Sequence, residues 1–352
     1  MKAWVLHGIN DLRYETVEKP TLSNDEVLVA VKAAGICGSD IPRIYRTGTY
    51  SYPLIPGHEF AGVVVDCGEV VDKSLKDARV GVFPLIPCGE CRPCRNRQYE
   101  MCRNYSYLGS RRDGGFAEYV AVPAKNLIRL PDNVTFEEAA MLEPMAVAVH
   151  AIRHVTFSDT DTIVVCGLGT IGLLVLMFLM EKENGSSQRI LVVGNKDFQW
   201  RTVEQMGLQQ ERYCDSRKQD VHKWVMERTN GKGADVFFEC VGKNETLVQA
   251  VGTVAPAGRI VLVGNPSSDM TLEKNVYWKL LRNQITVKGT WNSSFAREAD
   301  DDWHYALDKL SGKRVTPAAL ITHRFALGDL ERGFQIMLNK EEDYCKVMGV
   351  LE

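Results

Sequence analysis

Four of the ten cysteines are close together in the sequence, at Cys88, Cys91, Cys94 and Cys102. Four thiolates at such short spacings can surround one zinc ion tetrahedrally and leave no coordination position open, which is typical of a structural zinc site. Gly89 and Pro93 allow the turns that this wrapping needs. An iron–sulfur cluster uses similar spacings, but the sequence shows no electron-transfer partner, so we predict structural zinc.

A second set of metal-binding residue types is dispersed along the chain, at Cys37, His58, Glu59 and Glu143. One thiolate, one imidazole and a carboxylate would leave a zinc ion a free position for water or substrate, as catalytic zinc requires. Each residue also has a simpler interpretation. Cys37 could be a small buried apolar residue, His58 a hydrogen-bonded core histidine, and Glu143 a charge at a helix N-terminus. Spacing alone does not join these residues into one site.

A glycine-rich segment, Gly167-Leu168-Gly169-Thr170-Ile171-Gly172, follows an apolar run and precedes a helical apolar stretch. In dinucleotide-binding loops the first glycine permits a tight turn and the second lets backbone amides approach the pyrophosphate. The third allows close packing of helix on strand, and the helix N-terminus favours the anion. We therefore predict cofactor contacts from Gly167, Gly169, Thr170, Ile171 and Gly172. The alternative is an ordinary glycine-rich turn between strand and helix.

The next predicted strand ends in Gly194-Asn195-Lys196, where many dinucleotide sites carry an acidic residue that binds the ribose hydroxyls. Asp197 is expected to begin the helix that follows. A carboxylate would repel a 2′-phosphate, whereas glycine leaves room and Lys196 adds positive charge, so the sequence favours NADP over NAD. Lys196 as a solvated loop charge is the alternative. Gly264, at the end of a later strand, is also expected to contact the cofactor.

The elements that must position these residues differ along the chain. Residues 1 to about 125 contain short apolar runs broken by glycine and proline, as in a small irregular β-barrel; the clearest runs are 26–31, 62–65 and 117–122. From about 160 to 290, apolar strands alternate with helical stretches, as in a parallel sheet covered on both faces; the strands are 162–166, 189–193, 235–240 and 259–264. Helices are expected at 300–310 and 327–338. The sequence thus predicts an α/β protein in which a doubly wound domain is inserted between two parts of another domain.

Composition excludes several classes of protein. The 352 residues are 45% hydrophobic and 25% charged, which is ordinary for a globular chain of about two domains. With 42 basic and 45 acidic residues, the net charge of −3 offers no positive excess for binding nucleic acid. The N-terminus lacks an apolar run of signal-peptide length, and the uncharged stretch 163–180 is interpreted as strand, turn and helix, not as a membrane span. We expect a cytoplasmic protein with reduced thiols and neither nucleic-acid nor membrane partners.

Taken together, the motifs resemble those of the zinc-dependent medium-chain dehydrogenase family over essentially the whole chain. Five of them occur in the family's order: 37–40 (CGSD), 57–62 (GHEFAG), the four-cysteine segment, 113–119 (DGGFAEY) and the glycine loop. Segments 39–44 (SDIPRI) and 110–115 (SRRDGG) resemble the polyol dehydrogenase branch, and within it most closely the galactitol-1-phosphate 5-dehydrogenases.

The resemblance implies a GroES-like β-barrel catalytic domain over residues 1–150 that carries the structural-zinc lobe. It further implies a Rossmann cofactor-binding domain over 151–290, a C-terminal part of the catalytic domain over 291–352, and an active site between the two domains. It carries over one catalytic zinc per chain, besides the structural one, with Cys37, His58, Glu59 and Glu143 as its shell. Glu59 and Glu143 could exchange direct and water-mediated roles.

The sequence departs from the family's pattern at two places. Alcohol dehydrogenases of the family often place a histidine five residues after the zinc cysteine for proton relay, but this chain has Pro42 there. A relay must therefore end at Ser39 and water. The second departure is Gly194, which puts the family's usual NAD preference in doubt.

The predicted reaction is hydride transfer between a secondary alcohol of a polyol or polyol phosphate and a nicotinamide cofactor. The substrate hydroxyl would bind zinc, Ser39 would pass its proton outward, and Glu59 would take part in catalysis. Arg43, Arg111 and Arg112 could hold a substrate phosphate, although a solvated basic loop explains the same charges. Unphosphorylated polyols, threonine and butanediol are alternative substrates.

Two other classes of protein would lack parts of this pattern. A zinc-free, quinone-reductase-like enzyme would lack Cys37, His58 and the thiolate lobe, and an NAD(P)-sensing binding protein would lose the zinc shell. Family members are often oligomers, and residues 284–289 form an expected strand that could pair across a homodimer or homotetramer.

Overall fold

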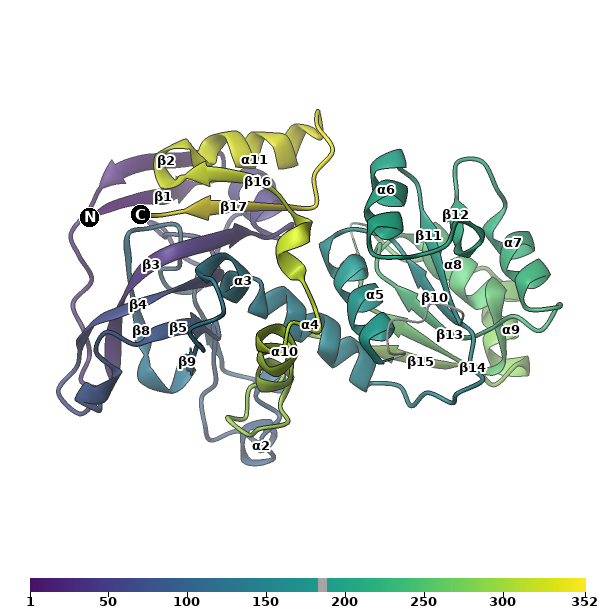
Figure 1. The fold of residues 1–352 in the computed structure, drawn as a ribbon, viewed down its shortest axis with the longest axis horizontal. Coiled ribbons are helices and arrows are strands. Elements are labelled where there is room, and N and C mark those ends of the chain that lie inside the picture. The colour runs from purple at the N-terminus through teal and green to yellow at the C-terminus, as the bar shows by residue number, and fades with distance from the viewer. Residues whose placement is uncertain (183–188, 267) are drawn as a thin grey trace. The chain divides into compact units, whose positions relative to one another are not determined.

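The computed structural model describes residues 1–182, 189–266 and 268–352. Contacts divide the chain into two compact units, which we call unit 1 (Met1–Ala146 with Ser293–Glu352) and unit 2 (Val147–Asn292). Figure 1 shows β-strands and short helices in unit 1 and a sheet flanked by helices in unit 2. Within the described ranges, no helix is long and apolar enough to cross a membrane.

The main sheet of unit 1 joins the two ends of the chain. Its strand order is β16-β17-β3-β4-β5-β9, and β8 also pairs with β3. The strands are β3 (Glu26–Ile36), β4 (Glu59–Cys67), β5 (Arg79–Val82), β8 (Tyr119–Pro123), β9 (Leu127–Arg129), β16 (Ile321–Ala326) and β17 (Lys346–Val350). The C-terminal strand β17 runs antiparallel to β3, with Val347 opposite Ile36. This pairing brings residues from the end of the chain beside the end of β3.

Smaller elements complete unit 1. Two short sheets are formed by β1 (Lys2–Gly8) with β2 (Asp11–Thr16) and by β6 (Leu85–Ile86) with β7 (Ser106–Tyr107). The helices are α1 (Asp40–Pro42), α2 (Arg92–Arg95), α3 (Phe136–Ala140), α4 (Leu142–Arg153, which continues into unit 2), α10 (Asp302–Ser311) and α11 (Leu330–Asn339). A π-helical turn, Arg43–Thr47, follows α1 directly. Phe334 of α11 is fully buried and joins the core formed by strands of the main sheet.

Unit 2 is a six-stranded parallel sheet in the order β12-β11-β10-β13-β14-β15. Its strands are β10 (Ile163–Cys166), β11 (Ile190–Gly194), β12 (Tyr213–Asp215), β13 (Ala234–Glu239), β14 (Val254–Leu262) and β15 (Thr286–Gly289). Its helices are α5 (Thr170–Lys182), α6 (Asp197–Gln205), α7 (Val221–Arg228), α8 (Asn244–Thr253) and α9 (Lys274–Arg282). All residues of β10 and β11 are buried, as expected for a parallel sheet covered on both faces.

The predicted α/β class and the predicted strands are confirmed. The uncharged stretch 163–180 is β10, a turn and most of α5, so its interpretation as strand, turn and helix is correct. Asp197 begins α6, as predicted. The last helix begins at Leu330 instead of residue 327, because Leu327–Asp329 forms a separate 3₁₀ turn. The three-residue strand β12 was not predicted.

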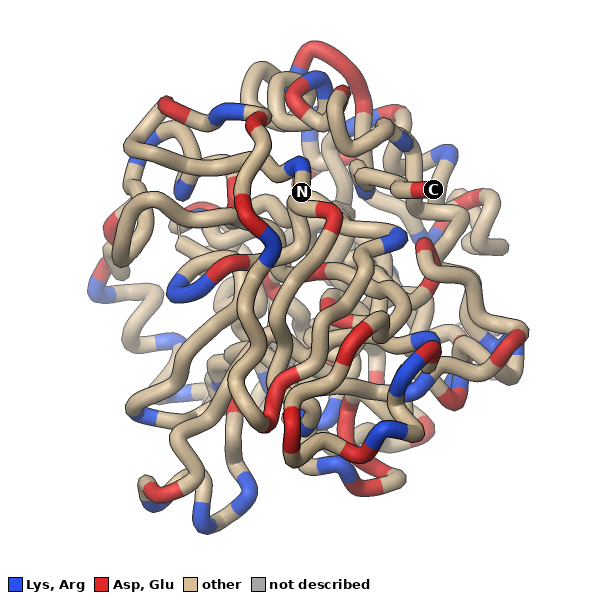
Figure 2. The backbone as a smooth tube through the Cα atoms, turned by 90° about the vertical axis from the view of Figure 1, so that its left-hand side faces the viewer, with Lys and Arg blue, Asp and Glu red and all other residues tan. Residues whose placement is uncertain are grey.

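Charged residues of both signs are mixed along the backbone (Figure 2), in keeping with the net charge of −3. Several individual ion pairs lie near the dispersed metal-binding residues.

Candidate active site and metal centres

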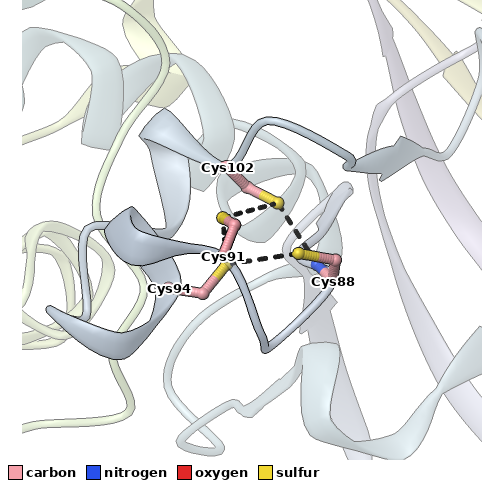
Figure 3. Close-up of side chains that lie close together, drawn as sticks. All are labelled: Cys88, Cys91, Cys94 and Cys102. Atoms are coloured by element: carbon pink, nitrogen blue, oxygen red, sulfur yellow. Dashed lines mark hydrogen bonds between the residues drawn. The ribbon is translucent and has the colours of Figure 1, made fainter.

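The four clustered cysteines direct their sulfur atoms toward one another (Figure 3). All four Sγ atoms lie within 4.8 Å of one another. The Sγ–Sγ distance is 3.5 Å for Cys91 and Cys94, and 3.9 Å both for Cys88 with Cys94 and for Cys91 with Cys102. A tetrahedral zinc ion with Zn–S bonds of ~2.3 Å separates its sulfurs by about 3.8 Å. The cluster therefore fits a zinc ion with no open position.

The backbone around this cluster supplies hydrogen bonds to the sulfurs. Cys88 N–H donates to Cys102 Sγ at 3.2 Å. The backbone N–H groups of Arg103 and Cys94 lower the pKa of the Cys91 thiol to about 6, whereas burial raises the pKa of Cys94 to about 12. The segment thus favours a thiolate at Cys91, which is the form that binds zinc.

A second group joins three of the four dispersed residues. The ligand atoms of Cys37, His58 and Glu59 lie within 4.8 Å of one another. Cys37 follows the last residue of β3, His58 directly precedes β4, and Glu59 is the first residue of β4. The antiparallel pairing of these strands places Gly35 opposite Glu59 and so brings the two segments together. One sulfur, one nitrogen and one carboxylate fit a zinc ion that keeps a position for water or substrate.

Two glycines give this group its shape. Gly57 has φ +95°, and a Cβ there would lie 2.7 Å from the ring of Phe116, so a side chain would displace the backbone that leads to His58. A Cβ on Gly35 would lie 2.4 Å from Glu59 Oε2. The Glu59 carboxylate therefore fills the space that a larger residue at position 35 would occupy.

Asp40 connects the parts of this group. It is fully buried and accepts hydrogen bonds from Cys37 N–H at 3.0 Å and from Arg43 at 2.6 Å. Its Oδ1 lies 3.4 Å from His58 Nδ1. Burial alone would lower the pKa of His58, but the charges of Asp40 and of a Cys37 thiolate raise that pKa well above its ordinary value. His58 Nδ1 makes no hydrogen bond to Asp40 at 3.4 Å, so Asp40 acts on the ring through its charge.

Ser39 and Glu143 approach the group by different routes. Ser39 Oγ donates to Cys37 Sγ at 3.3 Å. Glu143, in the first turn of α4, is not among the three residues whose ligand atoms lie within 4.8 Å. Its Oε1 accepts a hydrogen bond of 3.2 Å from the hydroxyl of Tyr107, whose ring centroid lies 5.8 Å from that of His58. Burial, together with the charge of Glu59, raises the pKa of Glu143 to about 7.

Lys346 is a member of the site that sequence reasoning missed. This fully buried lysine begins β17, forms an ion pair with Glu59 Oε2, and donates to the carbonyl of Ile36 at 3.1 Å. Burial alone would lower the pKa of Lys346, but the negative charge of Glu59 raises it above its ordinary value. No local pattern marks this lysine, because its partner is 287 residues away in the chain. Tyr107 was missed for a similar reason.

The three glycines of the cofactor loop have three different surroundings. Gly167 has φ +95°, and a Cβ there would meet Val241 at 2.5 Å. A Cβ on Gly169 would meet nothing within 4 Å, so its face is open to an approaching ligand. A Cβ on Gly172 would lie 1.8 Å from the Gly167 carbonyl oxygen. Thr170 and Ile171 open α5, so the open glycine lies at a helix N-terminus that could accept a pyrophosphate.

The end of β11 has no carboxylate, as the sequence indicated. A Cβ on Gly194 would approach the Tyr213 hydroxyl at 2.8 Å, and the Tyr213 hydroxyl itself donates to the Lys196 carbonyl at 3.2 Å. Asn195 N–H donates to Gln199 at 2.8 Å. The carboxylate nearest in register, Asp215 on β12, is paired with Arg217.

Gly264 packs against another loop. A Cβ at this position would lie 2.1 Å from the backbone nitrogen of Gly242, and Gly264 N–H donates to the Glu239 carbonyl at 2.9 Å. Its lack of a side chain is therefore needed for packing beside the turn that follows β13, and its predicted contact with cofactor stays a prediction.

The three arginines considered for substrate binding are not equivalent. Arg43 is paired with Asp40 behind the metal-binding group. Arg112 is paired with Glu26 at the start of β3. The guanidinium of Arg111 instead contacts two tyrosine rings.

Comparisons with known proteins agree with these features. Residues 23–132 match the model of the alcohol dehydrogenase GroES-like domain, and residues 170–312 match that of the zinc-binding dehydrogenases. The chain is 31% identical to galactitol 1-phosphate 5-dehydrogenase of Escherichia coli K12 over 310 residues, which is 88% of each chain. It is 31% identical to L-idonate 5-dehydrogenase of Vitis vinifera over 344 residues, or 95% of this chain and 90% of that protein.

Solved structures give the same result. Galactitol-1-phosphate dehydrogenase from Escherichia coli superposes with a TM-score of 0.90 at 28% identity, covering 99% of this chain and 100% of that one. A zinc-binding dehydrogenase from Sinorhizobium meliloti 1021, bound to NADP, gives 0.88 at 26% identity, with 99% and 98% covered. An alcohol dehydrogenase, rspB of Escherichia coli CFT073, complexed with NADH, gives 0.89 at 29% identity, with 99% of each covered. The chain therefore belongs to the zinc-dependent medium-chain dehydrogenases, a family of alcohol and polyol oxidoreductases.

Proposed function

We propose that this enzyme transfers a hydride between a secondary alcohol of a polyol or polyol phosphate and a nicotinamide cofactor. The observation that carries the proposal is the Cys37–His58–Glu59 group, which offers a zinc ion three different donor atoms and leaves one position for substrate. The closed four-cysteine cluster would hold a second, structural zinc ion. The glycine loop at the start of α5 provides the cofactor site in the same chain.

When bound, zinc would acidify an alcohol hydroxyl and, in the reverse direction, polarise a carbonyl group. The chain's own residues would then hold the site in position and move the proton. Asp40 places its charge beside His58, and Lys346 holds the Glu59 carboxylate. Ser39, whose hydroxyl lies 3.3 Å from Cys37 Sγ, is placed to receive the alcohol proton. Because residue 42 is proline, that proton would pass from Ser39 to water.

The carboxylate that binds zinc directly could be Glu59 or Glu143. Glu59 is close to Cys37 and His58, and Lys346 binds one of its oxygens, Oε2. Glu143 is held by Tyr107, and its raised pKa of about 7 gives it a protonated form near neutral pH. In this arrangement Glu59 would offer the metal a carboxylate oxygen beside Cys37 and His58, and Glu143 would act on the metal site directly or through water.

NADP is the cofactor we favour. Gly194 provides no carboxylate that would repel a 2′-phosphate, and Arg217 already pairs with the neighbouring carboxylates of Asp215 and Asp197. Lys196 adds a positive charge at the N-cap of α6. Among the similar structures, one is bound to NADP and another to NADH, so the choice has to be measured on this enzyme.

A substrate screen with both cofactors tests these proposals together. The zinc-loaded enzyme would be assayed with galactitol 1-phosphate, sorbitol, L-threonine and 2,3-butanediol, each with NAD and with NADP. We expect the highest kcat/KM with a polyol phosphate and NADP. Preference for an unphosphorylated alcohol would contradict the proposal that the substrate carries a phosphate, but the proposed dehydrogenase reaction would stand. The absence of turnover with every pair would contradict the proposed reaction.

A further inference from the structure

Arg111 holds its side chain in an unusual environment for an exposed arginine. Its guanidinium carbon lies 3.9 Å from the centroid of the Tyr50 ring and 4.5 Å from that of the Tyr105 ring. Aromatic rings attract a cation and cover the flat surface of the guanidinium. The N–H donors at its edge form a planar fork, which suits a phosphate or a carboxylate.

The charge of Arg111 is not neutralised within the part of the chain that the structure describes. In that part, no carboxylate lies at ion-pair distance from its guanidinium. The neighbouring charges are already engaged: Arg112 pairs with Glu26, and Asp113 accepts a hydrogen bond of 2.9 Å from the Ile55 N–H. Arg43, the other arginine near the metal group, pairs with Asp40. Arg111 therefore differs from Arg43 and Arg112, whose charges are paired.

A chain of aromatic contacts leads from Arg111 to the candidate metal centre. The Tyr105 ring centroid lies 6.2 Å from that of Tyr107. Tyr107 in turn binds Glu143 and lies 5.8 Å from the ring of His58. The guanidinium is thus separated from His58 by two tyrosines, and all four residues belong to unit 1.

The segment that carries Tyr50 is fixed to the segment that carries Arg111. Thr49 Oγ1 donates to the Ser110 carbonyl at 2.5 Å, and Thr49 N–H donates to the Tyr52 hydroxyl at 3.2 Å. A Cβ on Gly48, which has φ +76°, would lie 2.3 Å from the same hydroxyl, so the turn before Tyr50 is closely packed. These contacts hold together the two segments that carry Tyr50 and Arg111.

We propose that Arg111 binds an oxyanion, a phosphate or a carboxylate, on the substrate at a distance from the reacting hydroxyl. The assignment rests on the proposed dehydrogenase reaction and names the residue that would select its substrate class. Phosphate and carboxylate offer the same pair of oxygen acceptors to a guanidinium, so substrates with each group are needed to distinguish them.

The test compares Arg111→Ala and Arg111→Lys with the unmodified enzyme. All are loaded with zinc and assayed for kcat and KM with galactitol 1-phosphate, L-idonate and neutral sorbitol. Loss of a charged, two-pronged hydrogen bond should raise KM about 10- to 100-fold for an oxyanion substrate. We expect kcat to change by less than about threefold and KM for sorbitol to stay constant, because neither depends on the anion. For an oxyanion substrate, the KM of Arg111→Lys should lie between those of the parent enzyme and Arg111→Ala. Lysine keeps the positive charge but cannot form the two-pronged hydrogen bond.

Arg332→Ala is the matched control. It removes another exposed arginine of unit 1, one whose guanidinium lies 5.3 Å from the ring of Phe325 and takes no part in the proposed site. Zinc content and melting temperature would be measured for every variant, so that a loss of folding is not taken for a loss of binding. Of the two oxyanion substrates, the one that loses affinity selectively identifies the group that Arg111 recognises.

If Arg111→Ala raised KM equally for sorbitol and for the oxyanion substrates, or changed KM for neither, the proposed role of Arg111 would be wrong. A parent enzyme that prefers sorbitol would also contradict the proposed role of Arg111, but the proposed dehydrogenase reaction would stand. If the parent enzyme turned over none of these substrates, the proposed reaction would fail first. Calorimetric titration of galactitol 1-phosphate and L-idonate into the parent and Arg111→Ala proteins, each with cofactor present, would then decide the binding role alone: a lower affinity in the variant supports it, and equal or absent binding contradicts it.

Discussion

At the scale of single residues, the candidate active site depends on charges that are buried together. Lys346 and Glu59 are both almost completely inaccessible, and each would be an uncompensated charge without the other. Asp40, which is also buried, is balanced by Arg43 and His58. A zinc ion placed beside Cys37 would therefore enter a site whose carboxylates are already oriented.

Lys346→Met should be strongly destabilising, because it leaves the Glu59 carboxylate buried without its cation. We expect a loss of about 3 kcal/mol in the free energy of unfolding, measured by chemical denaturation, together with reduced turnover. The double variant Lys346→Met/Glu59→Gln removes both charges and should recover part of that stability. A single variant as stable as the parent protein would show that the ion pair contributes little.

Lys196→Ala tests the choice of cofactor at one side chain. If Lys196 faces the 2′-phosphate, its removal should lower kcat/KM for NADP about tenfold, the size of one charged contact. The value for NAD should be unchanged, because NAD carries no phosphate there. The measurement is a pair of initial-rate series with the two cofactors, and parallel losses with both would contradict a role in discrimination.

At the scale of elements, sequence patterns predicted the sheet of unit 2 well and the site of unit 1 only in part. The strands at 163–166 and 190–194 are continuous apolar runs, so a parallel sheet follows from their composition alone. The three-residue strand β12 has too short a pattern to separate from a loop. The packing role of Gly172 is local, because a Cβ there would lie 1.8 Å from the carbonyl oxygen of Gly167, whereas a Cβ on Gly167 would meet the distant Val241.

The parts of the site that escaped prediction depend on contacts between distant segments. Lys346 reaches Glu59 only because β17 pairs with β3, and β3 pairs with β4. Tyr107 reaches Glu143 from a two-residue strand. The residue types of Cys37 and His58 indicated metal binding, but only the resemblance to a family joined them before the structure did.

The start of β3 gives a prediction about pH. Burial would raise the pKa of Glu26, but hydrogen bonds from the Ser23 N–H and from Arg112 outweigh it and lower that pKa below its ordinary value. A lowered folded-state pKa means that this carboxylate stabilises the protein above its unfolded-state pKa and loses that contribution as the pH falls through the folded-state value. Glu26→Gln should therefore be about 1 kcal/mol less stable than the parent at pH 7.

The stability difference between the Glu26→Gln variant and its parent should shrink at pH values where Glu26 is protonated in both states. Denaturation curves at pH 7 and at a series of pH values that extends well below the ordinary glutamate pKa of about 4.3 would measure this change, because the folded-state pKa of Glu26 lies lower still. A difference that is independent of pH would mean that the substitution acts through packing and not through charge.

At the scale of the whole molecule, the two parts of the reaction lie in different units. The metal-binding residues and Lys346 belong to unit 1, and the glycine loop with Gly194 belongs to unit 2. The proposed reaction therefore draws its metal-binding residues from unit 1 and its cofactor loop from unit 2. The chain passes between the units twice, at the boundaries that follow Ala146 and Asn292.

Unit 2 also carries the surface on which we expect two chains to pair. All four residues of β15, at the end of the sheet order, are exposed, and so are Trp278 and Leu281 of α9. Val287→Lys places a charge on this strand and should convert a dimer or tetramer to a smaller species, as measured by light scattering after gel filtration. Val70→Lys, at a more exposed valine of unit 1, should leave the mass unchanged. A parent protein that is monomeric would contradict the expected pairing.

The central claim is that the chain has two zinc sites of different chemistry, one closed by four cysteines and one open at Cys37, His58 and a carboxylate. Metal analysis of the parent protein and of Cys37→Ser, together with their turnover, tests it most directly. We predict about two zinc ions per chain in the parent and about one in the variant, with turnover abolished and cofactor binding retained. A Cys37→Ser enzyme with full activity, or one that still holds both zinc ions, would contradict the account.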